Sequence, residues 1–540
     1  MIKSNRFIIV ALIVLQYQCR FSATAQKNGR NAGNPNIIFI LADDLGYGDV
    51  KCFNPEGKIL TPNIDNMALN GVMFTDAHTS SAVCTPTRYG ILTGRYNWRS
   101  SLKSSVLSGY SQSLIKPDRT TIAGMLRQQG YTTGYIGKWH LGWDWDIKKE
   151  ESALIKNDST DGEQKVPGLN IDDLSKNPCV NYSTPIKNGP SKHGFDYSFG
   201  FCGSLDMSPY VYVENDVPTM VPTKTTVSVD DKGFWRKGPT ADDFVHDKVL
   251  QSLTDKAVNF INRSAKGGKP FFLYLPLSAP HTPILPTTEF LGKSNTNMYG
   301  DFVLEVDDVV RQIREVIMTN GIADNTLVVF TSDNGCSPKA NFEELAKVGH
   351  DPSYIFRGTK ADIYEGGHHV PFIIEWPKGA AKNKSVSNTI CLTDFFATCA
   401  EITGYRLKDN EGEDSFSLVP LLKGETIEKF RDYTVHHSID GSFAIRQGDW
   451  KLCVCPGSGG WSYPTSVDIK KENMNLPSMQ LFNLKDDIGE TNNRIGEYPE
   501  KAAELKAALK KIILDGRSTA GARQENDGME GWKQIESIIN

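Results

Sequence analysis

The sequence predicts an α/β fold: a large N-terminal domain whose mainly parallel or mixed sheet lies between layers of helices, and a small C-terminal domain with an antiparallel sheet and a terminal helix. Three observations indicate this. Apolar, β-rich runs end abruptly in polar residues, and helical patterns lie between these runs. After about residue 425 the chain consists of short strand-like segments, separated by turns rich in Gly and Pro, and a helix. The predicted organisation is a signal peptide over residues 1–25, a main domain over 26–424 and an α+β domain over 425–540.

Four apolar runs have the composition of strands that are covered on both faces. They comprise residues 36–41, 132–137, 271–275 and 326–330. Each run is followed by side chains able to do chemistry, namely Asp43 and Asp44, Lys138 and His140, His281, and Asp333 and Asn334. Because ligands gather at the carboxyl ends of parallel strands, we expect these side chains to lie along one rim of the sheet.

Helical patterns occupy the intervening segments. Apolar residues recur at helical spacing over residues 121–129 and 301–318. Beyond residue 425, turns rich in Gly and Pro separate short strand-like segments, and a helix follows them. These three segments and the helix comprise residues 442–446, 451–455, 480–483 and 500–514.

The N-terminus has the features of an export signal. Lys3 and Arg6 precede an apolar run over residues 7–15, and small residues follow at 23–25. Cys19 does not fit a lipoprotein signal, because the bulky Gln18 precedes it. No later run approaches the ~20 apolar residues of a membrane helix, so we expect no stable membrane span. We expect an exported protein, periplasmic in a bacterium, with secretion or a lysosomal location as alternatives.

Charge and cysteine content narrow the possible functions. The net charge is −5 and no long block of Lys or Arg occurs, which argues against nucleic-acid binding. Ten cysteines are present, and processing would leave nine. An odd number in an oxidising compartment indicates that one cysteine serves a purpose other than a disulfide. The alternative is that several of the cysteines are buried thiols.

Cys84 begins a segment that we expect to start a helix. Pro86 suits a first helical turn and Gly94 a helix end. Cys84 would then lie at the helix N-terminus, where free N–H groups and the helix dipole favour negative charge. Arg88 follows four residues later and shares the same face of the helix.

Asp43, Asp44, Asp333 and Asn334 together form a set of hard oxygen ligands. Such a set suits Ca²⁺ better than Zn²⁺, which prefers His and Cys. The alternative for each pair alone is structural, because Asp-Asp after a strand is often a helix cap and Asp-Asn-Gly is a common turn.

The segment Cys84-Thr85-Pro86-Thr87-Arg88, followed by Leu92-Thr93-Gly94-Arg95, resembles the signature of the type I sulfatases of the alkaline phosphatase superfamily. Five further segments resemble motifs of that family in the family's order, between about Pro35 and Pro377. They are Asn36 to Gly46, Gly137 to His140, Pro280 to Pro283, Ser332 to Gly335, and Arg357 to Lys360 with Tyr364 to Gly367.

The resemblance implies that Cys84 is oxidised to formylglycine by a formylglycine-generating enzyme or an anaerobic sulfatase-maturating enzyme. It implies one Ca²⁺ per chain, held by Asp43, Asp44, Asp333, Asn334 and residue 84. One hydroxyl of the hydrated aldehyde, a gem-diol, would attack sulfur, and the other would then expel sulfate. The resemblance also implies a role for each residue that matches a family motif. Arg88 and Lys138 would hold the gem-diol, and His140 would be the base for sulfate elimination. His281 and Lys360 would contact the sulfate, and His281 would donate a proton to the leaving alcohol.

This sequence departs from the family pattern at two positions. Thr87 stands where Ser is more usual, and His369 stands where relatives often carry Arg. His369 could contribute different chemistry at the substrate site or only a different packing contact.

The long segment over residues 143–245 is expected to be rich in loops and to line the substrate pocket. Asp206 and Tyr210 are candidate contacts to a sulfated carbohydrate, such as a glycosaminoglycan, although they could also only order the loop. The main alternative function is a phosphonate or phosphodiester hydrolase with the same signature. An inactive glycan-binding protein would keep the pocket and leave Cys84 unoxidised, and a two-zinc phosphatase would need further His and Asp ligands.

Overall fold

The computed structural model describes residues 33–147 and 180–539. The signal peptide predicted over residues 1–25 lies outside these residues. The described residues from Asn34 onward form one compact unit. The domain boundary between residues 424 and 425 therefore remains a prediction from the sequence.

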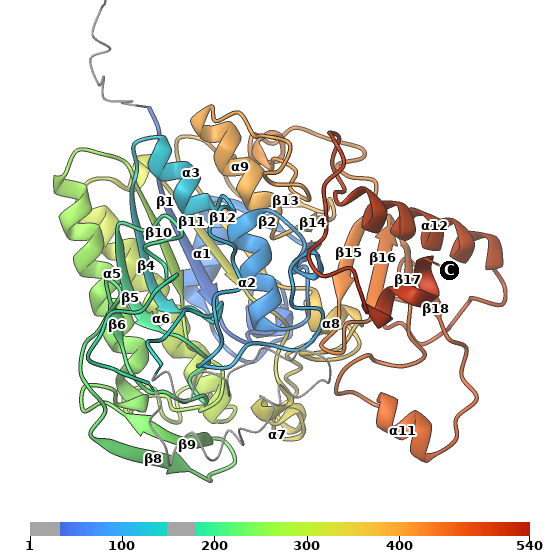
Figure 1. The fold of residues 1–540 in the computed structure, drawn as a ribbon, viewed down its shortest axis with the longest axis horizontal. Helices are drawn as coiled ribbons and strands as arrows, with labels where there is room; N and C mark the ends of the chain where they lie inside the picture. The colour runs from blue at the N-terminus through green and yellow to red at the C-terminus, as the bar shows by residue number, and fades with distance from the viewer. Residues whose placement is uncertain (1–32, 148–179, 540) are drawn as a thin grey trace, which may run out of the picture. The chain divides into compact units, whose positions relative to one another are not determined.

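A large mixed sheet forms the centre of the molecule (Figure 1). Its strands are, in spatial order, β13 (Lys384–Val386), β2 (Val72–Phe74), β12 (Phe372–Glu375), β11 (Thr326–Ser332), β1 (Asn36–Ala42), β10 (Phe271–Pro276), β4 (Thr132–Lys138), β5 (Tyr197–Phe201), β6 (Val213–Glu214) and β7 (Val217–Pro218). The five strands from β11 to β5 are mutually parallel. β12 pairs antiparallel with β11 at one side of this group, and β6 with β5 at the other.

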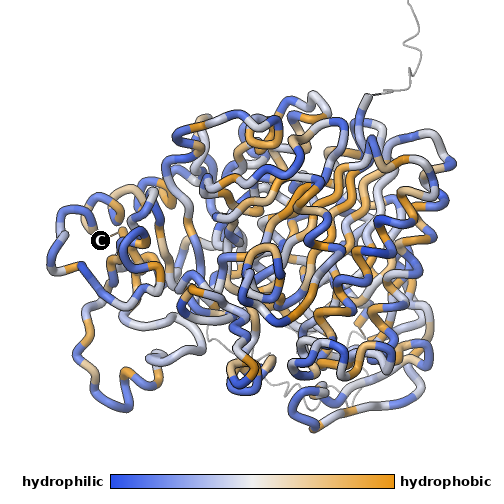
Figure 2. The backbone as a smooth tube through the Cα atoms, turned by 180° about the vertical axis from the view of Figure 1, so that it is seen from behind, coloured by the Kyte–Doolittle hydropathy of each residue, from blue (hydrophilic) through white to orange (hydrophobic). Residues whose placement is uncertain are grey.

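The four predicted strands are confirmed as the middle of this sheet, β11, β1, β10 and β4. β1 pairs with β11 so that Ala42 is opposite Ser332, and with β10 so that Leu41 is opposite Pro276. All of β10 and β11 is buried, which explains why these runs are continuously apolar rather than alternating. Figure 2 shows these strands as a hydrophobic block inside the molecule.

Helices pack on the sheet in two groups. The first group comprises α1 (Pro62–Asn70), α5 (Val249–Lys266) and α6 (Met298–Thr319), in which α6 contacts both other helices. The second comprises α2 (Cys84–Thr93), α3 (Ile122–Gln128) and α9 (Asp394–Thr403), which contact one another (Figure 1). The helices predicted near residues 121–129 and 301–318 are thus confirmed as α3 and α6. The shorter helices are α7 (Phe342–Lys347), α8 (Glu365–His368), α10 (Val419–Leu422), α11 (Ser466–Lys471) and α13 (Glu536–Ile539).

A second, antiparallel sheet lies towards the C-terminus, as predicted (Figure 1). It comprises β15 (Thr434–His437), β16 (Phe443–Gln447), β17 (Trp450–Cys453) and β18 (Gln480–Asn483). Helix α12 (Pro499–Asp515) packs on it through Leu505, Leu509 and Ile513, and Gly516 ends this helix in a left-handed conformation. β15 was not predicted, because its sequence, which ends in two histidines, shows no alternation of apolar and polar residues.

The segment over residues 143–245 contains more regular structure than expected. β5 joins the main sheet beside β4, and β8 (Lys224–Ser228) and β9 (Trp235–Thr240) form a separate antiparallel pair. A two-stranded sheet of β3 (Ala77–His78) and β14 (Ile390–Cys391) lies elsewhere in the fold. β3 and β14 are two residues long each, and they form through pairing with each other across a large distance in sequence rather than through a local pattern.

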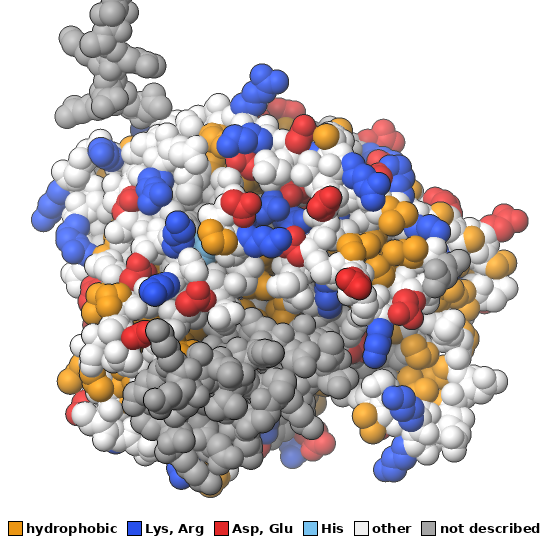
Figure 3. All heavy atoms as spheres, viewed as in Figure 1, with side chains coloured by type: hydrophobic (Ala, Val, Ile, Leu, Met, Phe, Trp, Pro, Cys, Tyr) orange, Lys and Arg blue, Asp and Glu red, His pale blue; other side chains and the backbone are white. Residues whose placement is uncertain are grey.

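No helix of the described residues is long and apolar enough to cross a membrane. On the face in Figure 3, outside the grey atoms, positive and negative side chains are interspersed. The eight cysteines that the structure describes are all free thiols, and seven of these are buried.

Gly137 provides a test of how tightly the site end of β4 is packed. Its φ is +142°, and a Cβ there would lie 1.8 Å from the carbonyl oxygen of Pro276 on β10. We expect Gly137→Ala to lower the free energy of unfolding by roughly 2–4 kcal/mol, because it adds backbone strain and overpacking. Gly124→Ala in α3 is the control, since its Cβ would have only an ordinary contact, 3.5 Å from Thr121. Equal stability of the two variants in denaturant unfolding would contradict this account.

Candidate active site

Asp43, Asp44, Asp333 and Asn334 converge where β1 and β11 end. Because Ala42 and Ser332 are paired, the residues that follow them leave the sheet side by side. The Asp44 N–H donates to Asp333 Oδ1 at 3.2 Å, and Asn334 Nδ2 donates to Asp44 Oδ1 at 2.7 Å. All four side chains are buried. The rim expected from the strand ends is therefore present.

Three cationic side chains surround these carboxylates. Arg88 Nη2 lies 2.6 Å from Asp333 Oδ2, and Lys138 Nζ lies 2.6 Å from Asp43 Oδ2. Lys360 Nζ lies 2.8 Å from an Asp44 carboxylate oxygen. Three carboxylates therefore face three cations in a buried space, and each carboxylate has a cationic partner.

Cys84 is the first residue of α2, and extended backbone at Val83 leads into it. Gly94 ends the helix, as predicted, and it adopts a left-handed conformation. Burial raises the pKa of the Cys84 thiol, while the nearby Lys138 and Lys360 act to lower it. The groups that act on this thiol thus belong to the carboxylate and lysine cluster.

His140 follows β4 in the left-handed region, with φ of 52°. Its Nε2 donates to the Leu107 carbonyl oxygen at 2.7 Å, and its buried Nδ1 has no hydrogen-bond partner among the described residues. Burial, and then the positive charges of Lys138 and Arg88, hold the pKa of His140 well below its usual value. The ring is therefore neutral, and the lone pair on Nδ1 is available as a base.

His281 lies on the other side of the cluster. Its Nδ1 donates to the Thr282 carbonyl oxygen at 2.5 Å, and its Nε2 is 3.6 Å from Asp44 Oδ2. Burial and the charge of Lys360 lower the pKa of His281. Ser204, which the motifs did not indicate, lies between His281 and Lys138, with Oγ 3.1 Å from Lys138 Nζ.

The cluster fits a hard divalent cation. Asp43 Oδ1 and Asn334 Oδ1 are buried, and neither has a hydrogen-bond partner among the described residues. Asp43, Asp44 and His281 bring possible ligand atoms within 4.8 Å of one another. Burial and the charge of Asp43 raise the pKa of Asp333, although Arg88 contacts it. A cation would relieve the repulsion between Asp43 and Asp333, and it would bind the two oxygens that lack hydrogen-bond partners. Carboxylate and amide oxygens are ligands that suit Ca²⁺.

A cavity of about 960 Å³ opens beside the cluster. His281, Lys360, Asp206, Arg236 and Trp461 are among its lining residues. Asp206 forms an ion pair with Arg236, and the Asp206 Oδ1 atom is buried without a partner among the described residues. Arg236 and Trp461 were not predicted, since neither belongs to a motif or a periodic segment of the sequence.

Tyr210 is buried, at 1% exposure, and its hydroxyl donates to the Arg236 carbonyl oxygen at 2.6 Å. The same hydroxyl lies 3.1 Å from the Asp206 carbonyl oxygen, so Tyr210 orders the loop that carries Asp206.

His369 packs its ring on Phe356 with centroids 4.1 Å apart, and it contacts Glu365. These contacts favour the packing interpretation of His369.

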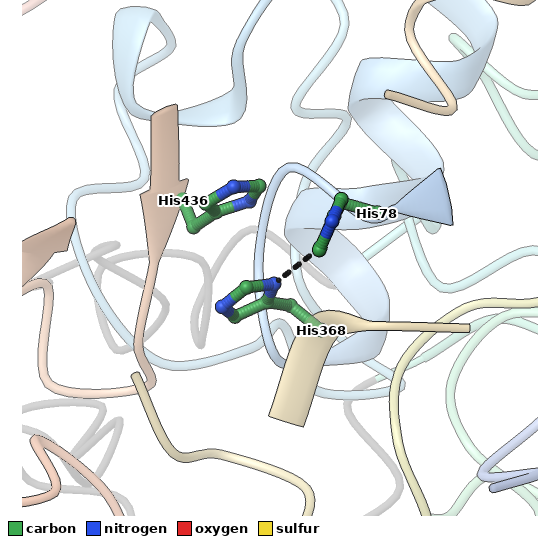
Figure 4. A group of neighbouring side chains, drawn as sticks. All are labelled: His78, His368 and His436. Carbon is green, nitrogen blue, oxygen red and sulfur yellow. Dashed lines mark hydrogen bonds between the residues drawn. The ribbon is translucent and has the colours of Figure 1, made fainter. Parts of the chain in front are cut away.

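Three buried histidines, His78, His368 and His436, form a second cluster (Figure 4). His78 Nδ1 and His368 Nδ1 are 3.0 Å apart. The rings of His368 and His436 are stacked, with centroids 4.0 Å apart and planes 7° from parallel. Because an imidazole nitrogen binds a metal in the plane of its ring, these two stacked rings cannot both bind one ion in this arrangement. Lys451 Nζ is also 3.1 Å from His368 Nε2, so the other nitrogen of this ring already has a cationic neighbour.

The histidine cluster instead joins three parts of the chain. The Thr79 N–H donates to the His368 carbonyl oxygen at 2.8 Å, and His436 Nδ1 donates to the Thr79 carbonyl oxygen at 3.1 Å. Ala82 in turn accepts from the Ala361 N–H at 2.8 Å. The segments that lead to Cys84 and Lys360 are thus fixed to each other and to β15.

Comparisons with known proteins give the family. A family model described as Sulfatase matches residues 35–405. The N-acetylgalactosamine-6-O-sulfatase of Bacteroides thetaiotaomicron is 31% identical over 522 residues, which cover 90% of this chain and 94% of that protein. Human arylsulfatase D is 29% identical, over 79% of this chain and 75% of the relative.

A solved structure described under the metabolism of multiple glycosaminoglycans by Bacteroides thetaiotaomicron matches with a TM-score of 0.74 and 30% identity. It covers 89% of this chain, which in turn covers 99% of that structure. The chain belongs to the sulfatase family, as the resemblance of its motifs predicted, and it is a sulfatase enzyme.

The buried histidines predict how stability changes with pH. Burial lowers the pKa of His78 to about 4, below its ordinary value of 6.5. The unfolded chain therefore takes up this proton first as pH falls, and stability present above pH 6.5 is lost between pH 6.5 and 4. This histidine should contribute a slope of up to ~1.4 kcal/mol per pH unit in that window.

Denaturant unfolding of the wild type and of His78→Gln across this range measures the effect. We expect a shallower decline for the variant, whatever its stability at neutral pH. Parallel declines would show that His78 does not titrate in this way.

Proposed function

We propose that this sulfatase removes sulfate from an ester of a sulfated carbohydrate, through oxidised Cys84 and one bound Ca²⁺. The observation that carries the proposal is the buried set of carboxylate and amide oxygens beside Cys84, two of which have no partner among the described residues. The printed names of the relatives, an N-acetylgalactosamine-6-O-sulfatase and a glycosaminoglycan-metabolism structure, support a glycan substrate.

Asp43, Asp44, Asp333, Asn334 and oxidised residue 84 would hold the cation. When bound, Ca²⁺ supplies positive charge that polarises the sulfate and offsets its repulsion of an anionic nucleophile. The fit rests on donor chemistry, because the side chains of Asp43, Asp44, Asp333 and Asn334 offer carboxylate and amide oxygens.

Arg88 and Lys138 would orient the hydrated aldehyde at residue 84, since both act on the cluster that adjoins it. His140 would accept the proton that must leave when sulfate is expelled. Its neutral ring and partner-free Nδ1 are what a general base needs.

His281 and Lys360 would contact the sulfate, since both line the cavity and both lie against Asp44. His281 would donate a proton to the leaving alcohol from Nε2, because Nδ1 is engaged by Thr282. Its lowered pKa means that the ring must first gain a proton, and an anionic ester nearby would raise that pKa.

Asp206 is the proposed contact to a sugar hydroxyl, since its unpaired Oδ1 can accept a hydrogen bond. Tyr210 would act through the backbone of that loop, and His369 through its packing on Phe356. The proposal also includes export through the signal at residues 1–25, a periplasmic location, and oxidation of Cys84 by a maturating enzyme of either kind.

Parallel assays on a sulfate ester and the matching phosphate ester test this function. We expect a higher kcat/KM for the sulfate, loss of turnover on chelation, and recovery with Ca²⁺ but not Zn²⁺. A higher kcat/KM for the phosphate ester would reverse the assignment to that of a phosphoester hydrolase.

Thermal unfolding gives an independent readout of the cation. Ca²⁺ should raise the Tm of the chelator-treated protein, because an ion that binds only the folded state stabilises it. The shift should be much smaller for Asp43→Asn, which removes one charge from the cluster. An unchanged Tm in the wild type would argue against the cation site.

A further inference from the structure

Trp461 is a large aromatic residue that is 47% exposed, which is unusual for a hydrophobic side chain of this size. It follows β17 of the C-terminal sheet, yet it lines the cavity that His281 and Lys360 also line. Lys360 Nζ lies over the indole ring, 5.9 Å from its centre. One face of the indole is thus turned towards the proposed sulfate-binding lysine.

The loop that carries Trp461 is held firmly against the segment that carries Lys360. The Trp461 N–H donates to Asp362 Oδ1 at 2.8 Å, and the backbone and side chain of Ser462 bond to the same buried carboxylate. A Cβ at Gly460 would lie 2.5 Å from the backbone of Ala361. The exposed indole is therefore anchored by its backbone on the residues next to Lys360.

Asp206 and Arg236 provide the polar part of the same cavity. Asp206 offers a buried carboxylate oxygen without a partner among the described residues, and Arg236, at 40% side-chain exposure, offers guanidinium donors. A volume of about 960 Å³ is far more than a sulfate group needs. An acceptor, a set of donors and an aromatic face together match a sugar ring, whose hydroxyls are polar and whose C–H faces are apolar.

We propose that Trp461 is a stacking platform for the pyranose ring that carries the scissile sulfate, with Asp206 and Arg236 binding its hydroxyls. This inference rests on the proposed function and names the part of the substrate that the cavity holds. The C-terminal sheet then contributes directly to specificity, since the loop after β17 supplies this face of the substrate site.

Kinetics with two substrates test the proposal: 6-O-sulfated N-acetylgalactosamine, which has a pyranose ring, and an unbranched alkyl sulfate, which has none. For Trp461→Ala we expect the ratio of kcat/KM for sugar to kcat/KM for alkyl sulfate to fall about tenfold, mainly through the KM of the sugar. Trp461→Leu should behave like the Ala variant, and Trp461→Tyr should restore most of the ratio. The matched control is Tyr463→Ala in the same loop, which is 60% exposed and should leave the ratio unchanged.

An unchanged ratio in Trp461→Ala, or equal loss with Leu and Tyr, would overturn the stacking role. A wild-type protein that hydrolyses the alkyl sulfate as efficiently as the sugar sulfate would overturn the sugar site and leave sulfate hydrolysis intact. Failure of the proposed function would look different, because the wild type would then hydrolyse neither sulfate.

Discussion

Six ionised side chains share one buried space at the ends of β1, β11 and β4. Removing a charge from water costs several kcal/mol unless a partner compensates it. Asp43, Asp44 and Asp333 therefore need the partners that they have, which are Lys138, Lys360 and Arg88 respectively. These residues come from five distant segments, so the sheet, helix α2 and the Lys360 segment must all be in place before the charges balance.

The same requirement explains why the C-terminal sheet belongs to the site. Lys360 lies on a segment without regular structure, and its neighbours are held from the C-terminal side: Asp362 by the loop at 461–462, and Glu365 by Lys451 on β17. His436 on β15 contacts the segment that leads to Cys84. The second sheet thus helps to position the segments that carry Lys360 and Cys84, and the loop after β17 places Trp461 in the lining of the cavity.

The rim of the sheet could be predicted because its strands are long, wholly apolar and followed at once by charged residues, as at Asp43 and Asp333. The end of α2 could be predicted because Gly94 provides a local signal. Trp461 and the histidine cluster could not. No local pattern marks a lone tryptophan in a Gly-rich loop. The same is true of three histidines that are spread over more than 350 residues, because only tertiary contacts bring them together.

A charged, buried pocket is proposed to surround an oxidised side chain at position 84. Mass spectrometry of the peptide that contains Cys84, from protein isolated from its native host, tests this most directly. Replacement of the thiol by an aldehyde should lower the peptide mass by about 18 Da relative to cysteine. A peptide that retains an intact free thiol would contradict the account and favour a glycan-binding protein without catalytic activity.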